Sequence, residues 1–212
     1  MHLDIEKVIN KLSNKRPVFF SEADFQHELN NILREEYPEA SIRLEYKRYV
    51  EPIVHLDVLV VIDYDKWFPI ELKYRTKDFI GTVNGEEYNL KNQGAKDMGS
   101  YLYLKDIQRI EEIKEKEDRF VEGYTIFITN DLAYAKAPTK ANANYKEFSL
   151  ENGTVKKGVL NWSKETGDGT KKGYEEPIIL KSEYPIEWKE YSKISDLENG
   201  TFMYLCNTIK RY

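Results

Sequence analysis

The chain of 212 residues is 41% hydrophobic and 33% charged, which allows one domain with a sizeable core and is too polar for a membrane protein. A net charge of −5 argues against a protein that coats nucleic acid, because such binding needs many Lys and Arg residues to neutralise phosphates. The single Cys206 excludes an intrachain disulfide, and the charges along residues 1–15 do not form a secretory signal, so we expect a cytoplasmic protein.

The first predicted element is a helix that starts after Ser21 and ends at Pro38. Ser21 is a favourable N-cap, and the acidic residues of the first turn suit the positive end of the helix dipole. Apolar residues then recur at helical spacing: Phe25, Leu29, Ile32 and Leu33. Farther on, apolar and polar residues alternate from 42 to 46, which predicts a strand.

Two further strands are predicted at 54–62 and 68–75, joined by a turn at 64–66. In the first strand, Asp57 interrupts a hydrophobic run, where an ionised side chain is costly unless it is paired or bound to a cation. In the second strand, Glu71, Lys73 and Arg75 share the face opposite to the apolar residues. Asp57 and Glu71 are therefore expected to come close across the strand pair.

Two carboxylates and a lysine on adjacent strands are typical of a magnesium site beside a phosphodiester. Magnesium prefers oxygen ligands, and one or two carboxylates plus substrate phosphate hold it. Asp57 and Glu71 are the predicted ligands of Mg²⁺ or Mn²⁺. Lys73 is predicted to position the attacking water and to stabilise the negative charge that develops.

The elements in the rest of the chain are predicted from turn-forming residues and from the periodicity of apolar residues. The segment 76–92 contains Gly81, Asn84 and Gly85 and is interpreted as a flap, an extra hairpin or a surface insertion. A long helix is predicted from about Gln93 to Lys116, and a buried strand at 123–129. Beyond residue 130, a hairpin is predicted at 145–162 around an Asn-Gly turn, followed by a β-rich region.

Asp57 and the run Pro69 to Lys73 resemble the PD-(D/E)XK phosphodiesterase superfamily, which includes many restriction enzymes and Holliday-junction resolvases. Glu-x-Lys occurs four times in the chain, and only the copy at Glu71 lies in an apolar strand that follows a strand with a lone Asp. The resemblance covers about residues 19–130. It implies an α/β fold with a restriction-endonuclease-like core (helix, three strands, helix, strand), in which helices flank a mixed sheet. The chain is then a single domain, 1–212, with a β-rich extension at about 131–212.

The resemblance also implies further site residues. An acidic or amide side chain on the first helix is expected to face the site; Glu22 and Gln26 are the candidates, and Glu28 is their rival. Gln26 matches the usual position but departs from the commoner Glu. On the second helix, Gln93 is expected to touch substrate, with a weaker case for Tyr101. Independently of the resemblance, Arg75 and Lys96 are candidates for substrate binding, because basic residues beside the site could guide the nucleic-acid backbone.

The predicted function is a magnesium-dependent deoxyribonuclease, which hydrolyses phosphodiester bonds in DNA and acts as an endonuclease or an exonuclease. DNA is the expected partner, a homodimer would suit cutting of both strands, and no membrane association is expected. One alternative is an inactive module of the same fold that binds nucleic acid or a protein. The other is a structural protein in which Asp57, Glu71, Lys73 and Arg75 form only a buried ion-pair network.

Overall fold

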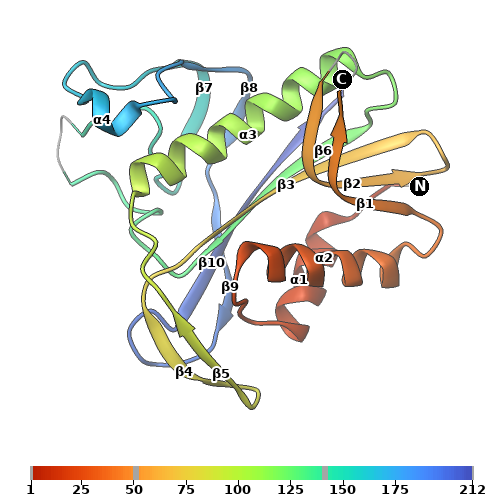
Figure 1. Ribbon diagram of the computed structural model, residues 1–212, viewed down its shortest axis with the longest axis horizontal. Helices are drawn as coiled ribbons and strands as arrows, with labels where there is room; N and C mark the ends of the chain where they lie inside the picture. The colour runs from red at the N-terminus through yellow and green to blue at the C-terminus, as the bar shows by residue number, and fades with distance from the viewer. Residues whose placement is uncertain (1, 50–52, 140–142, 212) are drawn as a thin grey trace.

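The fold is a mixed β-sheet with helices packed on both of its faces (Figure 1). The computed structural model describes residues 2–49, 53–139 and 143–211. Within these residues, the main sheet has six strands in the order β1-β2-β3-β6-β10-β9, and β3 and β6 are its parallel pair. The helices are α1 (Ile5–Lys15), α2 (Glu22–Glu36), α3 (Lys96–Lys116) and the short α4 (Asp168–Lys171). The strands are β1 (Ser41–Arg48), β2 (Val54–Ile62), β3 (Lys66–Arg75), β4 (Phe79–Val83), β5 (Glu86–Leu90), β6 (Glu122–Thr129), β7 (Val155–Leu160), β8 (Ile178–Pro185), β9 (Trp188–Lys193) and β10 (Thr201–Lys210). The prediction of an α/β fold with a mixed, helix-flanked sheet is confirmed.

Two hydrophobic clusters lie on opposite faces of the sheet. One packs α1 and α2 against a face that includes Val58, Val60 and Leu72. The other packs α3 against the opposite face, which includes Leu59 and Phe127. Strands buried on both faces are near-continuous apolar runs, so a charged residue inside one of them requires a specific partner.

The predicted N-terminal cap of α2 is confirmed, whereas α3 begins later than predicted. The Ser21 side chain accepts a hydrogen bond from the backbone N–H of Asp24 and so caps α2. Gly94 and Ala95 have positive φ angles of 42° and 48°, which a helix does not tolerate, and α3 therefore starts at Lys96. Gln93 was predicted to lie on this helix and instead lies before it. The helix α1 was not predicted.

The segment 76–92 forms an extra hairpin, one of the three predicted interpretations. Asn84 and Gly85 at its tip have φ angles of 51° and 86°, which the tight turn between β4 and β5 requires. Tyr88 of β5 stacks on Phe20 with ring centroids 4.3 Å apart, and Glu86 forms an ion pair with Arg16. These contacts hold the hairpin against the connection between α1 and α2.

Residues beyond 130 complete the main sheet. β10 lies between β6 and β9, so the predicted core range 19–130 supplies four of the six strands in the described part of the chain. The predicted hairpin at 145–162 is wrong, because β7 pairs with the more distant β8. The backbone of the Asn-Gly turn bonds elsewhere: Asn152 donates to the Ala135 carbonyl, and Gly153 donates to that of Ile186. Among the described residues, no helix is long and apolar enough to cross a membrane.

Candidate active site

The strands separate at Asp57. The ladder between β2 and β3 ends at the pair Val58 and Ile70, one step before Asp57 would meet Glu71. The ladder between β1 and β2 skips the position where Glu45 faces Asp57, and Glu45 has a φ of 49°. Such a conformation is uncommon for a residue with a side chain and often marks a functional irregularity. Asp57 therefore lies at a local break in the sheet.

The break also changes which face the β2 side chains occupy. Val58 packs with α1 and α2, as alternation along the strand predicts. Leu56, two residues earlier, packs in the cluster of α3 on the opposite face. Because alternate residues of a regular strand share a face, the strand must turn at the residue between them. That residue is Asp57.

Side chains replace the missing ladder partners along the open edge of β3. The Asp57 carboxylate accepts a hydrogen bond from the Leu72 N–H at 2.7 Å. Two residues farther along β3, the Glu22 carboxylate accepts a hydrogen bond from the Tyr74 N–H, also at 2.7 Å. Two carboxylates thus satisfy backbone donors that a neighbouring strand would otherwise have paired.

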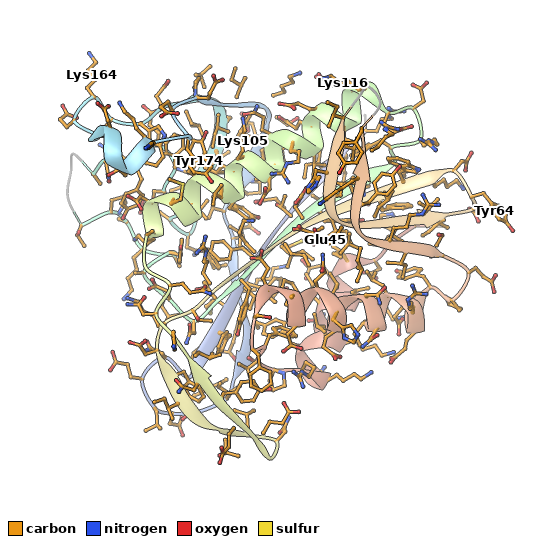
Figure 2. All side chains as sticks on the ribbon, viewed as in Figure 1. Glu45, Tyr64, Lys105, Lys116, Lys164 and Tyr174 are labelled. Atoms are coloured by element: carbon orange, nitrogen blue, oxygen red, sulfur yellow. The ribbon has the colours of Figure 1, made fainter. Side chains whose placement is uncertain are left out.

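Gln26 fixes the other side of the break. Its amide nitrogen donates to the Asp57 carbonyl at 2.9 Å and to the Glu45 carboxylate at 2.8 Å. Figure 2 shows Glu45 in the space between α2 and the strands. A cavity of about 170 Å³ opens there; its lining residues are Glu22, Ala23, Gln26, Glu45, Asp57 and Leu72. Both candidates on α2, Glu22 and Gln26, therefore reach the site. The rival Glu28 instead lies beside His27.

Glu71 and Lys73 face α3 and enter an ion-pair network with it. Arg109 Nη1 lies 2.8 Å from Glu71 Oε1, and Arg109 Nη2 lies 3.1 Å from Asp106 Oδ1. Lys73 Nζ lies 3.1 Å from Asp106 Oδ2 and donates to the Leu72 carbonyl at 3.2 Å. The network therefore joins two residues of β3 to two residues of α3.

Burial and crowded negative charge shift the pKa values of this cluster. Burial, then the charge of Asp106, raises the pKa of Glu71 well above its ordinary value, although Arg109 opposes the rise. Burial likewise raises the pKa of Asp106 against the effect of Lys73 and Arg109. Glu22 is open to solvent at the rim, yet desolvation by the surrounding protein raises its pKa. Burial lowers the pKa of Lys73, but its acidic neighbours outweigh this and leave the ammonium more firmly protonated.

The donor set fits a hard divalent cation. Glu22, Asp57 and Glu71 offer carboxylate oxygens, and Asp57 and Glu22 each use one oxygen in the hydrogen bonds to β3. In the described ranges, no group of three or more His, Cys, Asp or Glu side chains is placed so that it could hold a metal ion by itself. Magnesium does not need three protein ligands, since one or two carboxylates, waters and substrate phosphate complete its coordination. The residues that would hold it are Asp57 and Glu71.

The remaining predicted residues lie at varying distances from this centre. Arg75 is close enough for its charge to lower the pKa of Glu22. The Gln93 side chain accepts from the Thr76 N–H, so it supports the end of β3. Lys96 donates to the Ala133 carbonyl and lies over the Tyr145 ring. Tyr101 is buried, and its hydroxyl donates to the Glu176 carbonyl.

Asp106 and Arg109 are the site residues that the sequence analysis missed. Both lie on α3, 33 or more positions after Lys73 in the chain. A signal was available, because Asp106 falls one turn from Leu102 and Ile110 on the apolar stripe of the helix. A charged residue on the apolar stripe of a helix, like Asp57 in its apolar strand, indicates a buried charge that needs a partner.

No protein family, curated protein or solved structure matches this chain.

Proposed function

We propose that this protein is a metal-dependent nuclease of the PD-(D/E)XK type that hydrolyses phosphodiester bonds in DNA. The observation that carries the proposal is the break at Asp57. There, two carboxylates occupy the open edge of β3, while Glu71 and Lys73 of the same strand face α3. Four carboxylates lie in this region: Lys73 and Arg109 pair directly with Asp106 and Glu71, whereas Asp57 and Glu22 accept hydrogen bonds from backbone N–H groups of β3. The raised pKa values of Glu71, Asp106 and Glu22 reflect burial and crowding of these carboxylates, which a bound divalent cation would relieve.

The residues have distinct roles in the proposed reaction. Asp57 and Glu71 hold Mg²⁺ or Mn²⁺, which supplies polarisation of the phosphate and an acidified water. Lys73 carries a firmly held positive charge, and it orients the attacking water and stabilises the charge on the phosphoryl oxygens. Gln26 holds the backbone of Asp57, and Glu22 holds the edge of β3; both are positioning residues.

An inactive module of the same fold is the second candidate, and one observation favours it. Glu71 is paired with Arg109, and Lys73 is paired with Asp106, so both residues have partners without any ligand. Under this alternative, the network only joins β3 to α3, as a buried structural ion pair does. Such a module binds nucleic acid or a protein without cleaving it.

The test is a cleavage assay with supercoiled plasmid and with a single-stranded oligonucleotide, in Mg²⁺, Mn²⁺ or EDTA. We expect metal-dependent cleavage that Lys73→Ala reduces by about a thousandfold, because it removes the charge next to the reacting phosphate. The matched control is Lys66→Ala, which removes an exposed lysine paired with Asp63 at the turn between β2 and β3. Intact DNA with the wild type in every buffer, together with retained DNA binding, would support the inactive module instead.

A further inference from the structure

Arg109 is the most exposed member of the network around Glu71. Its side chain is 39% exposed, whereas the side chains of Glu71 and Asp106 are 2% and 4% exposed. The guanidinium therefore contacts a buried carboxylate and is open to the surface of α3 at the same time. Burial lowers the pKa of Arg109, but Glu71 and Asp106 more than compensate, so it keeps its charge.

Arg109 and a divalent cation would need the same carboxylate. Arg109 Nη1 lies 2.8 Å from Glu71 Oε1, and this carboxylate is one of the two proposed to hold the cation. Two positive groups at one oxygen repel each other strongly in a partly buried site. A pairing between Arg109 and Glu71 must therefore weaken the affinity of the site for the cation.

The guanidinium is also suited to a second ligand. It has five N–H donors in a planar fork that matches the oxygens of a phosphate, and each of its two terminal nitrogens contacts one carboxylate. Beside it, a hollow of about 30 Å³ opens at the surface of α3, lined by Ile53, Arg109, Glu112, Ile113 and Lys116. The Arg109 side chain therefore borders the surface of α3 as well as Glu71.

We propose that Arg109 is a substrate-contact residue that holds Glu71 in the resting protein and binds a phosphate of the nucleic acid once Glu71 is released. Asp106 keeps the guanidinium near the site through Nη2. This inference rests on the proposed nuclease function. It assigns Arg109 two opposed effects: it weakens cation binding and strengthens cleavage.

The experiment measures these two effects separately. Mn²⁺ affinity is measured by isothermal titration calorimetry without DNA, and cleavage is measured at saturating Mn²⁺, for the wild type, Arg109→Gln and Arg109→Lys. The matched control is Lys105→Gln, which removes one positive charge from α3 four residues before Arg109, outside the network of Glu71 (Figure 2). Circular dichroism checks that each variant is folded.

We expect Arg109→Gln to bind Mn²⁺ about tenfold more tightly and to cleave about a hundredfold more slowly. Arg109→Lys should keep the Mn²⁺ affinity of the wild type but cleave more slowly, because an ammonium lacks the planar pair of N–H donors with which a guanidinium binds phosphate. Lys105→Gln should change neither by more than about twofold. If the wild type binds Mn²⁺ and Arg109→Gln binds it with equal or lower affinity, the inference about Arg109 is wrong, whereas the proposed nuclease function is not affected. Absence of Mn²⁺ binding and of cleavage by the wild type would overturn the proposed function as well.

Discussion

At the scale of single residues, Asp106 is the centre of the charge network. Its carboxylate is almost completely buried and lies between the cations of Lys73 and Arg109. Removing one partner of a buried ion pair is costly, because the other charge is left in a medium of low polarity. The stability of the protein therefore depends on this residue, whatever the activity of the site.

We expect Asp106→Asn to lower the free energy of unfolding by about 3 kcal/mol, because it removes the direct ion-pair partner of the buried Lys73 ammonium. Urea unfolding measures the change. The control is Glu112→Gln, an exposed carboxylate of the same helix whose loss should cost under about 0.5 kcal/mol. In the double variant with Lys73→Met, most of the loss should be recovered; strictly additive effects would contradict the direct pairing.

Glu117 provides a test of pH dependence away from the site. Hydrogen bonds from Arg119 and Arg48 lower the pKa of Glu117 to about 2, against the opposing effect of burial. A carboxyl with a depressed pKa contributes stability above its unfolded pKa and loses it as the pH falls through the folded value. The contribution of Glu117 is therefore complete at neutral pH and is lost between its ordinary value of 4.5 and about 2.

We accordingly expect Glu117→Gln to be less stable than the wild type at neutral pH and equally stable near pH 2. Guanidinium unfolding across this range measures the difference between the two proteins at each pH. Glu115→Gln is the comparison, since Glu115 forms a more exposed pair with Lys181 and should show a smaller effect. A difference that does not decrease on acidification would show that the ionised form of Glu117 is not what stabilises the fold.

At the scale of elements, the open edge of β3 distinguishes this sheet from a regular one. The pairing with β2 ends at Ile70, yet the N–H groups of Leu72 and Tyr74 do not lack acceptors. Asp57 comes from the neighbouring strand and Glu22 from α2, so each acceptor ties a different element to β3. Docking of α2 and formation of the candidate site therefore depend on the same contacts.

Amide hydrogen exchange can separate these two contacts. We expect Asp57→Ala to accelerate exchange of the Leu72 amide by about tenfold or more and to leave the Tyr74 amide protected. Glu22→Ala should have the reverse effect, so that each variant is the control for the other. Equal acceleration of both amides in both variants would indicate that the whole edge opens as a unit.

At the scale of the whole molecule, the C-terminal third is part of the main sheet. β10 pairs with β6 on one side and β9 on the other, and its residues Phe202 and Leu205 are fully buried. The Tyr103 hydroxyl of α3 donates to the Asn207 side chain at 2.9 Å. The helix that carries Asp106 and Arg109 is thus packed against residues near the end of the chain.

We therefore expect a chain that ends at Asn130 not to fold, because β6 would lose its antiparallel neighbour and α3 would lose part of its packing. Size-exclusion chromatography and thermal unfolding followed by circular dichroism measure this. Replacement of α4, residues 168–171, by a Gly/Ser linker of equal length should be tolerated, since α4 contains no buried residue. Cooperative unfolding of the truncated chain would show that residues 1–130 are an independent unit.

Local patterns in the sequence were sufficient for most elements up to residue 130. The cap at Ser21, the apolar period of α2 and the alternation in β1 predict their elements, because capping and periodicity act over a few residues. Asp57 and Glu71 were identified for the same reason, since each charge lies in an apolar strand. Helix α1 was missed even though its apolar residues recur at helical spacing.

Only the tertiary structure decided how these elements combine. The left-handed conformation of Glu45, the pairing of Arg109 with Glu71 and the position of β10 each depend on residues far apart in the chain. No local propensity specifies such contacts, because their free energy comes from burial and charge pairing that arise only when distant segments pack together. The sequence by itself therefore determined the strands and their unusual charges, whereas the tertiary structure determined the partners of those charges.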